Sequence, residues 1–404
     1  MSTLTAYRAL VQHTSVGYLF ANFIARLPLA MSQIGVLLLV SGLTGSYRAG
    51  GACAGALAIA SGVGSPWWGA MADRHGQRPI LLVQSLGAAA AFVVLLAVAH
   101  SPLPWAATAV ASAFAGFLTP QVGPMSRVRW RPLTAGLDQQ ETLVGAAFSA
   151  EGAADEASFV LGPTLVGVAV ALASPTLALA SAAAMLAVFG TVFALHPSAT
   201  PGHPRDAAQH ADAGRLLSLP VVLICGSQFV IGMVFGSVQT GTSSLATATG
   251  HPEWTGYLHA LLGVGGVVAG LAVPLLPARF TLASRLRVFA VTLLALALPL
   301  LLVDSVSALV WVLLPLGLSV APYMITTFTV GERITPVWRT GTVMMLLAAA
   351  TTLGYATGAS LAGQLADLAG HQPAYAVTVT AGVVAVLISG LGHGALRRAE
   401  DAAA

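Results

Sequence analysis

The stretch HPSATPGHPRDAAQHADAGRL, residues 196–216, interrupts a long succession of apolar segments with Pro, His, Asp and Arg. Runs of about 20 apolar residues, the length of a membrane-spanning helix, recur on both sides of it. Six runs precede this stretch and six follow it. The sequence therefore predicts an N-terminal six-helix bundle over 1–195, a polar linker over 196–216 and a C-terminal six-helix bundle over 217–404.

The length of the apolar runs predicts an all-α integral membrane protein. Membrane-spanning β-strands would alternate in polarity over about 10 residues, and these runs are about twice as long. Twelve spans are expected, with the approximate bounds 14–44, 49–71, 79–99, 103–126, 141–173, 175–195, 217–246, 253–277, 286–303, 306–330, 337–366 and 372–395.

The composition agrees with a membrane protein and excludes several functions. Hydrophobic residues make up 56% and charged residues 8% of the chain, against about a quarter charged in soluble domains. All 17 basic residues are Arg, so the Lys of a P-loop ATPase or of a Schiff-base enzyme is absent. The H-E-x-x-H and G-x-S-x-G motifs are absent too, so we expect no enzyme, metal or cofactor. Arginines scattered in short loops are typical of topology signals rather than of nucleic-acid binding.

The distribution of the arginines predicts the orientation, because positive charge collects on the cytoplasmic side. With the N-terminus inside, 15 of the 17 arginines fall in segments on the inner side, and the exceptions are Arg26 and Arg48. We therefore expect both termini and the linker on the cytoplasmic side of the cytoplasmic membrane. We also expect a monomer. The inner arginines are residues 8, 74, 78, 127, 129, 131, 205, 215, 279, 285, 287, 333, 339, 397 and 398.

The two halves share a sequence pattern in their fifth spans. GPTLVG (162–167) and GASLAG (358–363) both fit G-x-x-L-x-G. Parallel repeats of this kind occur in secondary transporters, in which the substrate site lies at mid-depth between the halves. We therefore expect two pseudo-symmetric bundles around a central cavity.

The loop after the second span reads GAMADRHGQRP, residues 69–79, and matches G-x-x-x-D-R-x-G-x-R. It resembles the signature between spans two and three of the major facilitator superfamily, with Gln77 and Pro79 where the family usually has basic residues. The resemblance covers the whole chain and implies a twelve-span transporter that works by alternating access.

Each residue of this loop has a physical reason. Gly69 allows close helix packing, Gly76 permits a tight turn, and Asp73 can face the positive N-terminal end of a helix from the other half. In the superfamily this cluster acts as a cytoplasmic gate that holds the outward-open state, and the resemblance gives that role to Asp73, Arg74 and Arg78. Alternatively, these residues are ordinary loop caps and topology anchors.

The pair Gly162-Pro163, followed by Gly167, resembles part of the Gly-Pro motif of the superfamily's exporters. Pro163 cannot donate to the carbonyl of Phe159, so the helix is expected to loosen there while nearby glycines pack tightly and seal the outer side. A generic proline kink is the alternative. Many proton-coupled exporters also place an Arg within the fourth span, and here the first basic residue, Arg127, is expected at the inner end.

Four charged residues lie deep inside predicted spans, well away from the span ends: Arg26 in the first and Glu151, Asp155 and Glu156 in the fifth. Each charge at a helix centre costs about 2.5–3.5 kcal/mol, so partners or water are required. Similar depths favour an ion pair between Arg26 and Asp155 or Glu156. Glu151 and Asp155 share one helix face, and Glu156 is rotated by about 100° from Asp155.

One Arg cannot neutralise three carboxylates. Two poorly hydrated carboxylates on one face titrate as a unit, and a carboxyl that gains and loses a proton near neutral pH can couple transport to a proton gradient. The alternative is a static brace formed by Arg26 and one acid.

Asn22, Gln121 and Tyr323 are further candidates for the cavity wall, with interhelical hydrogen bonds as the alternative. The sequence as a whole predicts proton-coupled export of a small organic molecule, with protons and the lipid bilayer as the other partners. A proton-coupled importer of a sugar or organic anion, in which Arg26 would hold an anionic substrate, is one alternative. A transport-inactive sensor or scaffold is another.

Overall fold

The structure is a computed structural model that describes residues 3–202, 217–251, 254–277 and 280–402, and none of these residues forms a strand. Residues 203–216 of the predicted linker lie outside the described residues. The helical segments are α1 (Thr3–Thr14), α2 (Val16–Ile24), α3 (Leu27–Thr44), α4 (Tyr47–His75), α5 (Gln77–Ala99), α6 (Trp105–Leu118), α7 (Val122–Leu133), α8 (Gln140–Leu172), α9 (Pro175–Met185), η1 (Leu186–Gly190), α10 (Thr191–Leu195), α12 (Leu219–Ala248), α13 (Thr255–Ala272), η3 (Val273–Leu275), α14 (Leu282–Ala297), η4 (Leu298–Leu302), α15 (Val306–Ile334), η5 (Val337–Arg339), α16 (Thr340–Ala369), α17 (His371–Leu391) and α18 (His393–Ala402).

The described residues include ten helical segments that are long and apolar enough to cross a membrane. Each coincides, within a few residues at either end, with one of the predicted spans. The second predicted span corresponds to α4, which is 29 residues long and rich in Gly, Ala and Ser, and the fourth corresponds to α6 and α7 together. The total of twelve spans remains a prediction.

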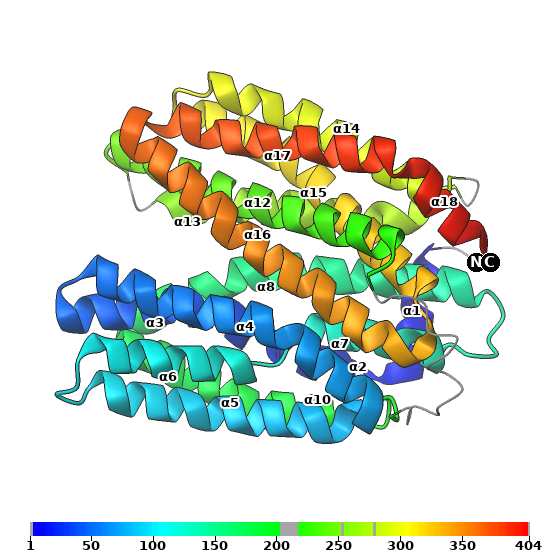
Figure 1. The fold of residues 1–404 in the computed structure, drawn as a ribbon, viewed down its shortest axis with the longest axis horizontal. Helices are drawn as coiled ribbons and strands as arrows, with labels where there is room; N and C mark the ends of the chain where they lie inside the picture. The colour runs from blue at the N-terminus through cyan, green and yellow to red at the C-terminus, as the bar shows by residue number, and fades with distance from the viewer. Residues whose placement is uncertain (1–2, 203–216, 252–253, 278–279, 403–404) are drawn as a thin grey trace.

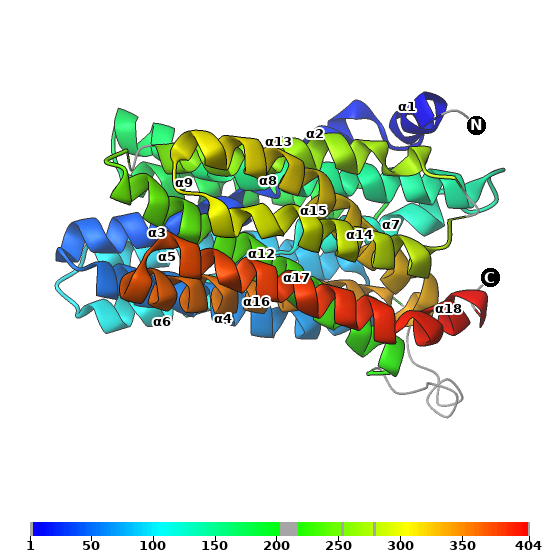
Figure 2. The same ribbon diagram turned by 90° about the horizontal axis from the view of Figure 1, so that it is seen from above.

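The helices lie side by side along one direction, and the two chain ends lie at the same end of the molecule (Figures 1 and 2). We call the end that carries Thr3 and Ala402 the terminal end. Figure 1 places α4, α5 and α6 on one side of the molecule and α14, α17 and α18 on the other. Helices that precede the linker meet helices that follow it mainly where α4 and α7 pack on α16 and where α8 packs on α13 and α15.

Two predicted spans are interrupted by a break in the helix. The first consists of α2 and α3, with Ala25 and Arg26 between them and Pro28 in the first turn of α3. The fourth is broken around Pro120. Proline has no backbone N–H to continue the helical hydrogen bonds, which explains why both breaks lie beside a proline.

The predicted end of the fourth span at residue 126 is wrong. Helix α7 continues to Leu133, so Arg127, Arg129 and Arg131 lie within a helix rather than in a connecting loop. The side chains of Arg127 and Arg129 are fully buried.

The shared G-x-x-L-x-G pattern makes equivalent contacts in the two halves of the sequence. A Cβ atom built on Gly162 of α8 would lie 2.6 Å from the Cβ of Ala30 in α3. A Cβ atom built on Gly358 of α16 would overlap the carbonyl oxygen of Met233 in α12. In both halves, therefore, the first glycine of the pattern lets the fifth span approach the first span of its own half, as small residues do at membrane helix contacts.

Replacing Gly354 with Ala is expected to destabilise the packing of α12 on α16. A methyl group there would overlap the carbonyl oxygen of Phe229, which is backbone and cannot move aside as a side chain could. Overpacking costs about 1–3 kcal/mol, so thermal unfolding in detergent should begin at a lower temperature. Gly363→Ala on the same helix is the control, because its Cβ would lie 3.9 Å from Thr240 Cγ2, an ordinary contact. Equal unfolding temperatures for the two variants would contradict this prediction.

Candidate functional site

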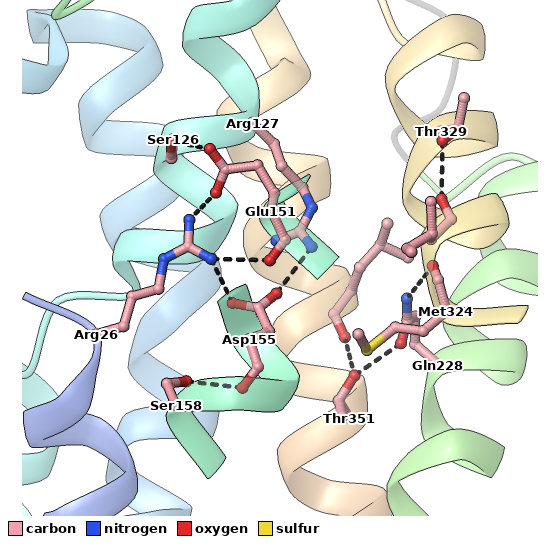
Figure 3. A network of polar contacts seen from close by, with 12 residues as sticks. Arg26, Ser126, Arg127, Glu151, Asp155, Ser158, Gln228, Met324, Thr329 and Thr351 are labelled. Atoms are coloured by element: carbon pink, nitrogen blue, oxygen red, sulfur yellow. Dashed lines mark hydrogen bonds and ion pairs between the residues drawn. The ribbon is translucent and has the colours of Figure 1, made fainter. Parts of the chain in front are cut away.

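A cluster of buried charges lies where α2, α3, α7 and α8 meet (Figure 3). Nη1 of Arg26 donates to Asp155 Oδ1 at 2.8 Å and to the backbone oxygen of Glu151 at 2.9 Å. Nη2 of Arg26 forms an ion pair with the Glu151 carboxylate. The predicted ion pair between Arg26 and Asp155 is thus confirmed. Glu151 also pairs with Arg26, because Glu151 and Asp155 lie on one face of α8.

Arg127 is the second cation of this cluster. Its Nη2 atom lies 2.8 Å from Asp155 Oδ2, and its side chain is fully buried. Its guanidinium carbon lies 4.2 Å from the ring centroid of Phe328 in α15, a cation–π contact that reaches a helix of the other half of the sequence. Two arginines therefore balance two carboxylates, and the cluster has no net charge when all four groups are ionised.

The oxygen atoms of Glu151 are held by further donors. Glu151 Oε1 accepts hydrogen bonds from Ser126 Oγ at 2.6 Å, Trp130 Nε1 at 2.8 Å and Asn22 Nδ2 at 3.3 Å. Asn22 Oδ1 in turn accepts from Arg26 at 3.2 Å. A buried carboxylate with this many donors is stabilised in its charged form, so Glu151 has the surroundings of a permanent anion.

Asp73 at the terminal end of α4 caps the N-terminus of α16. Its carboxylate accepts from the backbone N–H groups of Gly341 at 2.9 Å and Thr342 at 2.7 Å, and from the Thr342 hydroxyl at 2.6 Å. The sequence predicts this position, opposite a helix N-terminus of the other half, where a carboxylate is favoured by unpaired N–H groups and by the helix dipole.

The glycines of the same loop have the geometry that the sequence predicts. Gly76 has φ +90°, a conformation that only glycine adopts without strain, and it forms the turn between α4 and α5. A Cβ on Gly69 would lie 2.8 Å from the Gly341 carbonyl oxygen, so α4 and α16 are in backbone contact there. Arg78 donates to the backbone oxygen of Leu195 at 2.7 Å rather than to a carboxylate, and Arg74 is exposed.

A second group of ion pairs joins the two halves of the sequence at the terminal end. Arg131 of α7 pairs with Glu332 of α15, and it lies 2.9 Å from Glu141 of α8. Arg333 of α15 lies 2.6 Å from Glu141 and 3.6 Å from Glu400 of α18. These residues, apart from Glu400, line a pocket of about 790 Å³ together with Asp73 and Trp338.

Helix α1 adds a further link at this end. Tyr7 donates its hydroxyl to the carbonyl oxygen of Leu271 in α13 at 3.0 Å. Burial raises the pKa of Tyr7 to about 12, so the hydroxyl keeps its proton and remains a donor at physiological pH.

His196 directly follows α10. Burial and the nearby Arg129 guanidinium lower the pKa of His196, so this ring is neutral over more of the physiological range.

Comparisons with known proteins agree with this architecture. The family model described as Major Facilitator Superfamily matches residues 18–344. This chain belongs to the Major Facilitator Superfamily. Solved transporters share its fold: the human organic anion transporter MFSD10 (TETRAN), at 18% identity and TM-score 0.65, covers 94% of this chain and 99% of its own. A bacterial homologue of the iron transporter ferroportin, outward-facing with soaked iron, has 16% identity and TM-score 0.70 over 93% and 98% of the two chains. The transporter FucP in the outward conformation has 15% identity and TM-score 0.66 over 93% and 98%. No curated protein matches by sequence.

The structure decides between the two acids predicted as partners of Arg26 in this Major Facilitator Superfamily chain, and it corrects one other prediction. Asp155 pairs with Arg26, whereas Glu156 lies on a different face of α8 and contacts Gly266 of α13. Arg127 is not at the inner end of the fourth span, because it contacts Asp155, the sixteenth of the 33 residues of α8.

The exporter-like motif is only partly engaged in packing. Helix α8 continues through Pro163. Gly162 packs on Ala30 of the same half, whereas a Cβ on Gly167 would meet nothing within 4 Å. The expectation that these glycines pack tightly is therefore wrong for Gly167.

The three cavity candidates are placed in different surroundings. Asn22 belongs to the charge cluster. Gln121 Nε2 donates to Ser61 Oγ at 3.0 Å, an interhelical hydrogen bond. Tyr323 is fully buried in α15. The structure brings only Asn22 to the charged centre.

Proposed function

We propose that this protein is a twelve-span secondary active transporter whose two six-helix bundles alternate around a central site, exporting a small organic molecule as protons enter. The bundles comprise residues 1–195 and 217–404. The terminal end, which carries Thr3 and Ala402, faces the cytoplasm in the cytoplasmic membrane, as the arginine distribution favours. Membership of the superfamily points to transport rather than to an enzyme.

The observation that carries this proposal is the set of polar contacts between the halves at the terminal end. Asp73 binds the N-terminus of α16, and Arg131 pairs with Glu332 of α15. Hydrogen bonds and ion pairs at a partly hydrated surface are worth only a few kcal/mol. Contacts of this strength hold one side closed and can still break in each cycle, as alternating access requires.

Proton coupling and export are supported by separate features. Coupling is supported by the buried carboxyl groups of Glu151 and Glu156 in the middle of α8, because a buried carboxyl group that has no counter-ion binds a proton. Export is supported by the partial Gly-Pro motif at Gly162 and Pro163. The outward-facing conformation of two of the similar transporters agrees with closure at the terminal end.

The test is transport by purified protein in proteoliposomes that contain a pH-sensitive dye. A panel of toxic organic cations, anions and neutral compounds, first screened by growth inhibition with and without the protein, supplies the substrates. Proton-coupled export predicts resistance in cells and compound-dependent proton movement in liposomes. A sensor or scaffold predicts neither.

Import of an organic anion is the second candidate, and one observation favours it. Nη1 of Arg127 is buried and has no hydrogen-bond partner among the described residues, and the same guanidinium faces Phe328 of the other half. A donor that is free at the contact between the halves suits a carboxylate or phosphate. Arg26 is less suited, because both of its carboxylate partners are already in place. Uptake of a labelled organic anion, and no resistance phenotype, would favour import.

A further inference from the structure

Glu156 is a carboxyl group that forms no ion pair with any residue that the structure describes. Its side chain is 2% exposed, and Oε1 makes no hydrogen bond to any of the described residues. A Cβ built on Gly266 of α13 would lie 2.9 Å from Glu156 Cδ. The carboxyl therefore rests directly on the backbone of a helix from the other half of the sequence.

The balance of charges in the neighbouring cluster leaves Glu156 out. Arg26 forms ion pairs with Glu151 and Asp155, and Arg127 forms an ion pair with Asp155, so two cations balance two anions. Glu156 is next to Asp155 in sequence but lies on another face of α8, so neither arginine neutralises it. A buried carboxylate without a counter-ion or donors is strongly disfavoured, whereas a protonated carboxyl in the same place is tolerated.

The contact that covers Glu156 is a seam of small residues between α8 and α13. Gly263 faces Val160 on one side of Glu156, and Gly270 lies near the backbone of Ala153 on the other. Small residues let the two helices approach closely, so Oε1 of Glu156 is buried and the whole residue is only 2% exposed. Closing the seam therefore requires Glu156 to be neutral, and opening it lets water reach the group.

We infer that Glu156 is the proton-binding residue of this transporter. It is protonated while the seam between α8 and α13 is closed, and it releases its proton when the seam opens toward the terminal end. Glu151 and Asp155 remain paired with Arg26 and Arg127 as a static brace. This inference rests on the proposed function and deepens it, because it assigns the proton to one of three acids.

Few other ionisable groups face Glu156 from the described helices packed on it. Asp155 is the preceding residue in the sequence, and its side chain is 18% exposed. His259 lies on the same face of α13, two turns before Gly266. Helix α3 has no ionisable side chain. The charged residues of α15, Glu332 and Arg333, lie at its terminal end and form ion pairs with Arg131 and Glu141.

Infrared spectroscopy of the protein in phosphatidylcholine vesicles tests whether the Glu156 carboxyl is protonated. The wild type at pH 7 should show the C=O band of a protonated carboxyl. Glu156→Gln, which keeps the shape of the side chain, should remove this band, whereas Asp155→Asn and Glu151→Gln should leave it. A band that persists in Glu156→Gln, or a wild type without one, would overturn the inference.

Cysteine alkylation tests whether protonation closes the seam. Val160→Cys, with Cys53 and Cys225 replaced by Ser, reports on access of the reagent to the seam. Leu172→Cys, at a 77% exposed position, gives the pH dependence of alkylation for an accessible thiol, by which the Val160→Cys rate is divided. The corrected alkylation rate should rise with pH by at most about tenfold per pH unit, the limit for one linked proton. In Glu156→Gln the rate should be low and independent of pH. An unchanged pH dependence in that variant would overturn the inference.

Failure of the inference and failure of the proposed function can be told apart. Both measurements use protons alone as the ligand, so they stand even if no compound is transported. Once a substrate is found, Glu156→Gln should abolish uphill transport and retain exchange. Uphill transport that survives in Glu156→Gln would contradict the inference while the transporter assignment stands.

Discussion

Replacing Arg127 with Leu is expected to destabilise the protein by about 3–5 kcal/mol, the usual effect of removing one partner of a buried ion pair. The change leaves Glu151 and Asp155 to share Arg26, so the cluster gains an uncompensated negative charge. It also removes the cation that rests on Phe328. Unfolding in detergent, followed by tryptophan fluorescence, should show a lower midpoint, because Trp130 donates to Glu151 at the centre of the cluster.

Two further variants separate charge balance from loss of packing. Arg127→Leu combined with Asp155→Asn restores neutrality and should recover much of the lost stability. Arg48→Leu removes an exposed arginine from the other end of the molecule and should leave the midpoint unchanged. If the double variant were as unstable as the sum of its two single variants, the two residues would not be coupled, and the balanced cluster would be refuted.

The spans could be predicted from the sequence because a run of about 20 apolar residues is the length of a membrane-spanning helix and is rare in other structures. The interruptions follow from Pro28 and Pro120, yet hydropathy averages over a whole window and so ignores a break of two or three residues. The same averaging ended the fourth span too early and assigned Arg127 and Arg129 to a loop. One local signal pointed the other way: in a helix, Arg127 and Arg131 share one face and Arg129 points about 200° away from them, so the three arginines cannot all face water.

The pairing within the charged site depends on contacts between distant segments. Depth along a helix correctly brings Arg26 to the level of Asp155, and the spacing of four residues puts Glu151 on the same face. Depth alone cannot choose between Asp155 and Glu156, because adjacent residues differ in direction far more than in height. The choice follows from α13, whose glycines face Glu156, and that contact spans about 110 residues of sequence.

Replacing Asp73 with Ala is expected to open the terminal end. The variant loses three hydrogen bonds from the N-terminus of α16, two of them from backbone N–H groups that have no intrahelical partner. Hydrogen bonds to a charged group contribute about 1.5–3 kcal/mol each, and they are not additive here because they share one carboxylate. A net loss of about 2–3 kcal/mol would shift the ratio of open to closed forms by a factor of about 30–150.

Spin labels at His75 and Val337, exposed positions on either side of this contact, measure that shift as a distance distribution. In a background without Cys53 and Cys225, the parent protein should give mainly the shorter distance, and Asp73→Ala should add a longer one. Thr342→Val removes a single hydrogen bond and should have a smaller effect. Asp304→Ala, an exposed acid in the chain outside this contact, should have none. A distribution unchanged by Asp73→Ala would mean that the ion pairs of Arg131 and Arg333 hold this end closed without the help of Asp73.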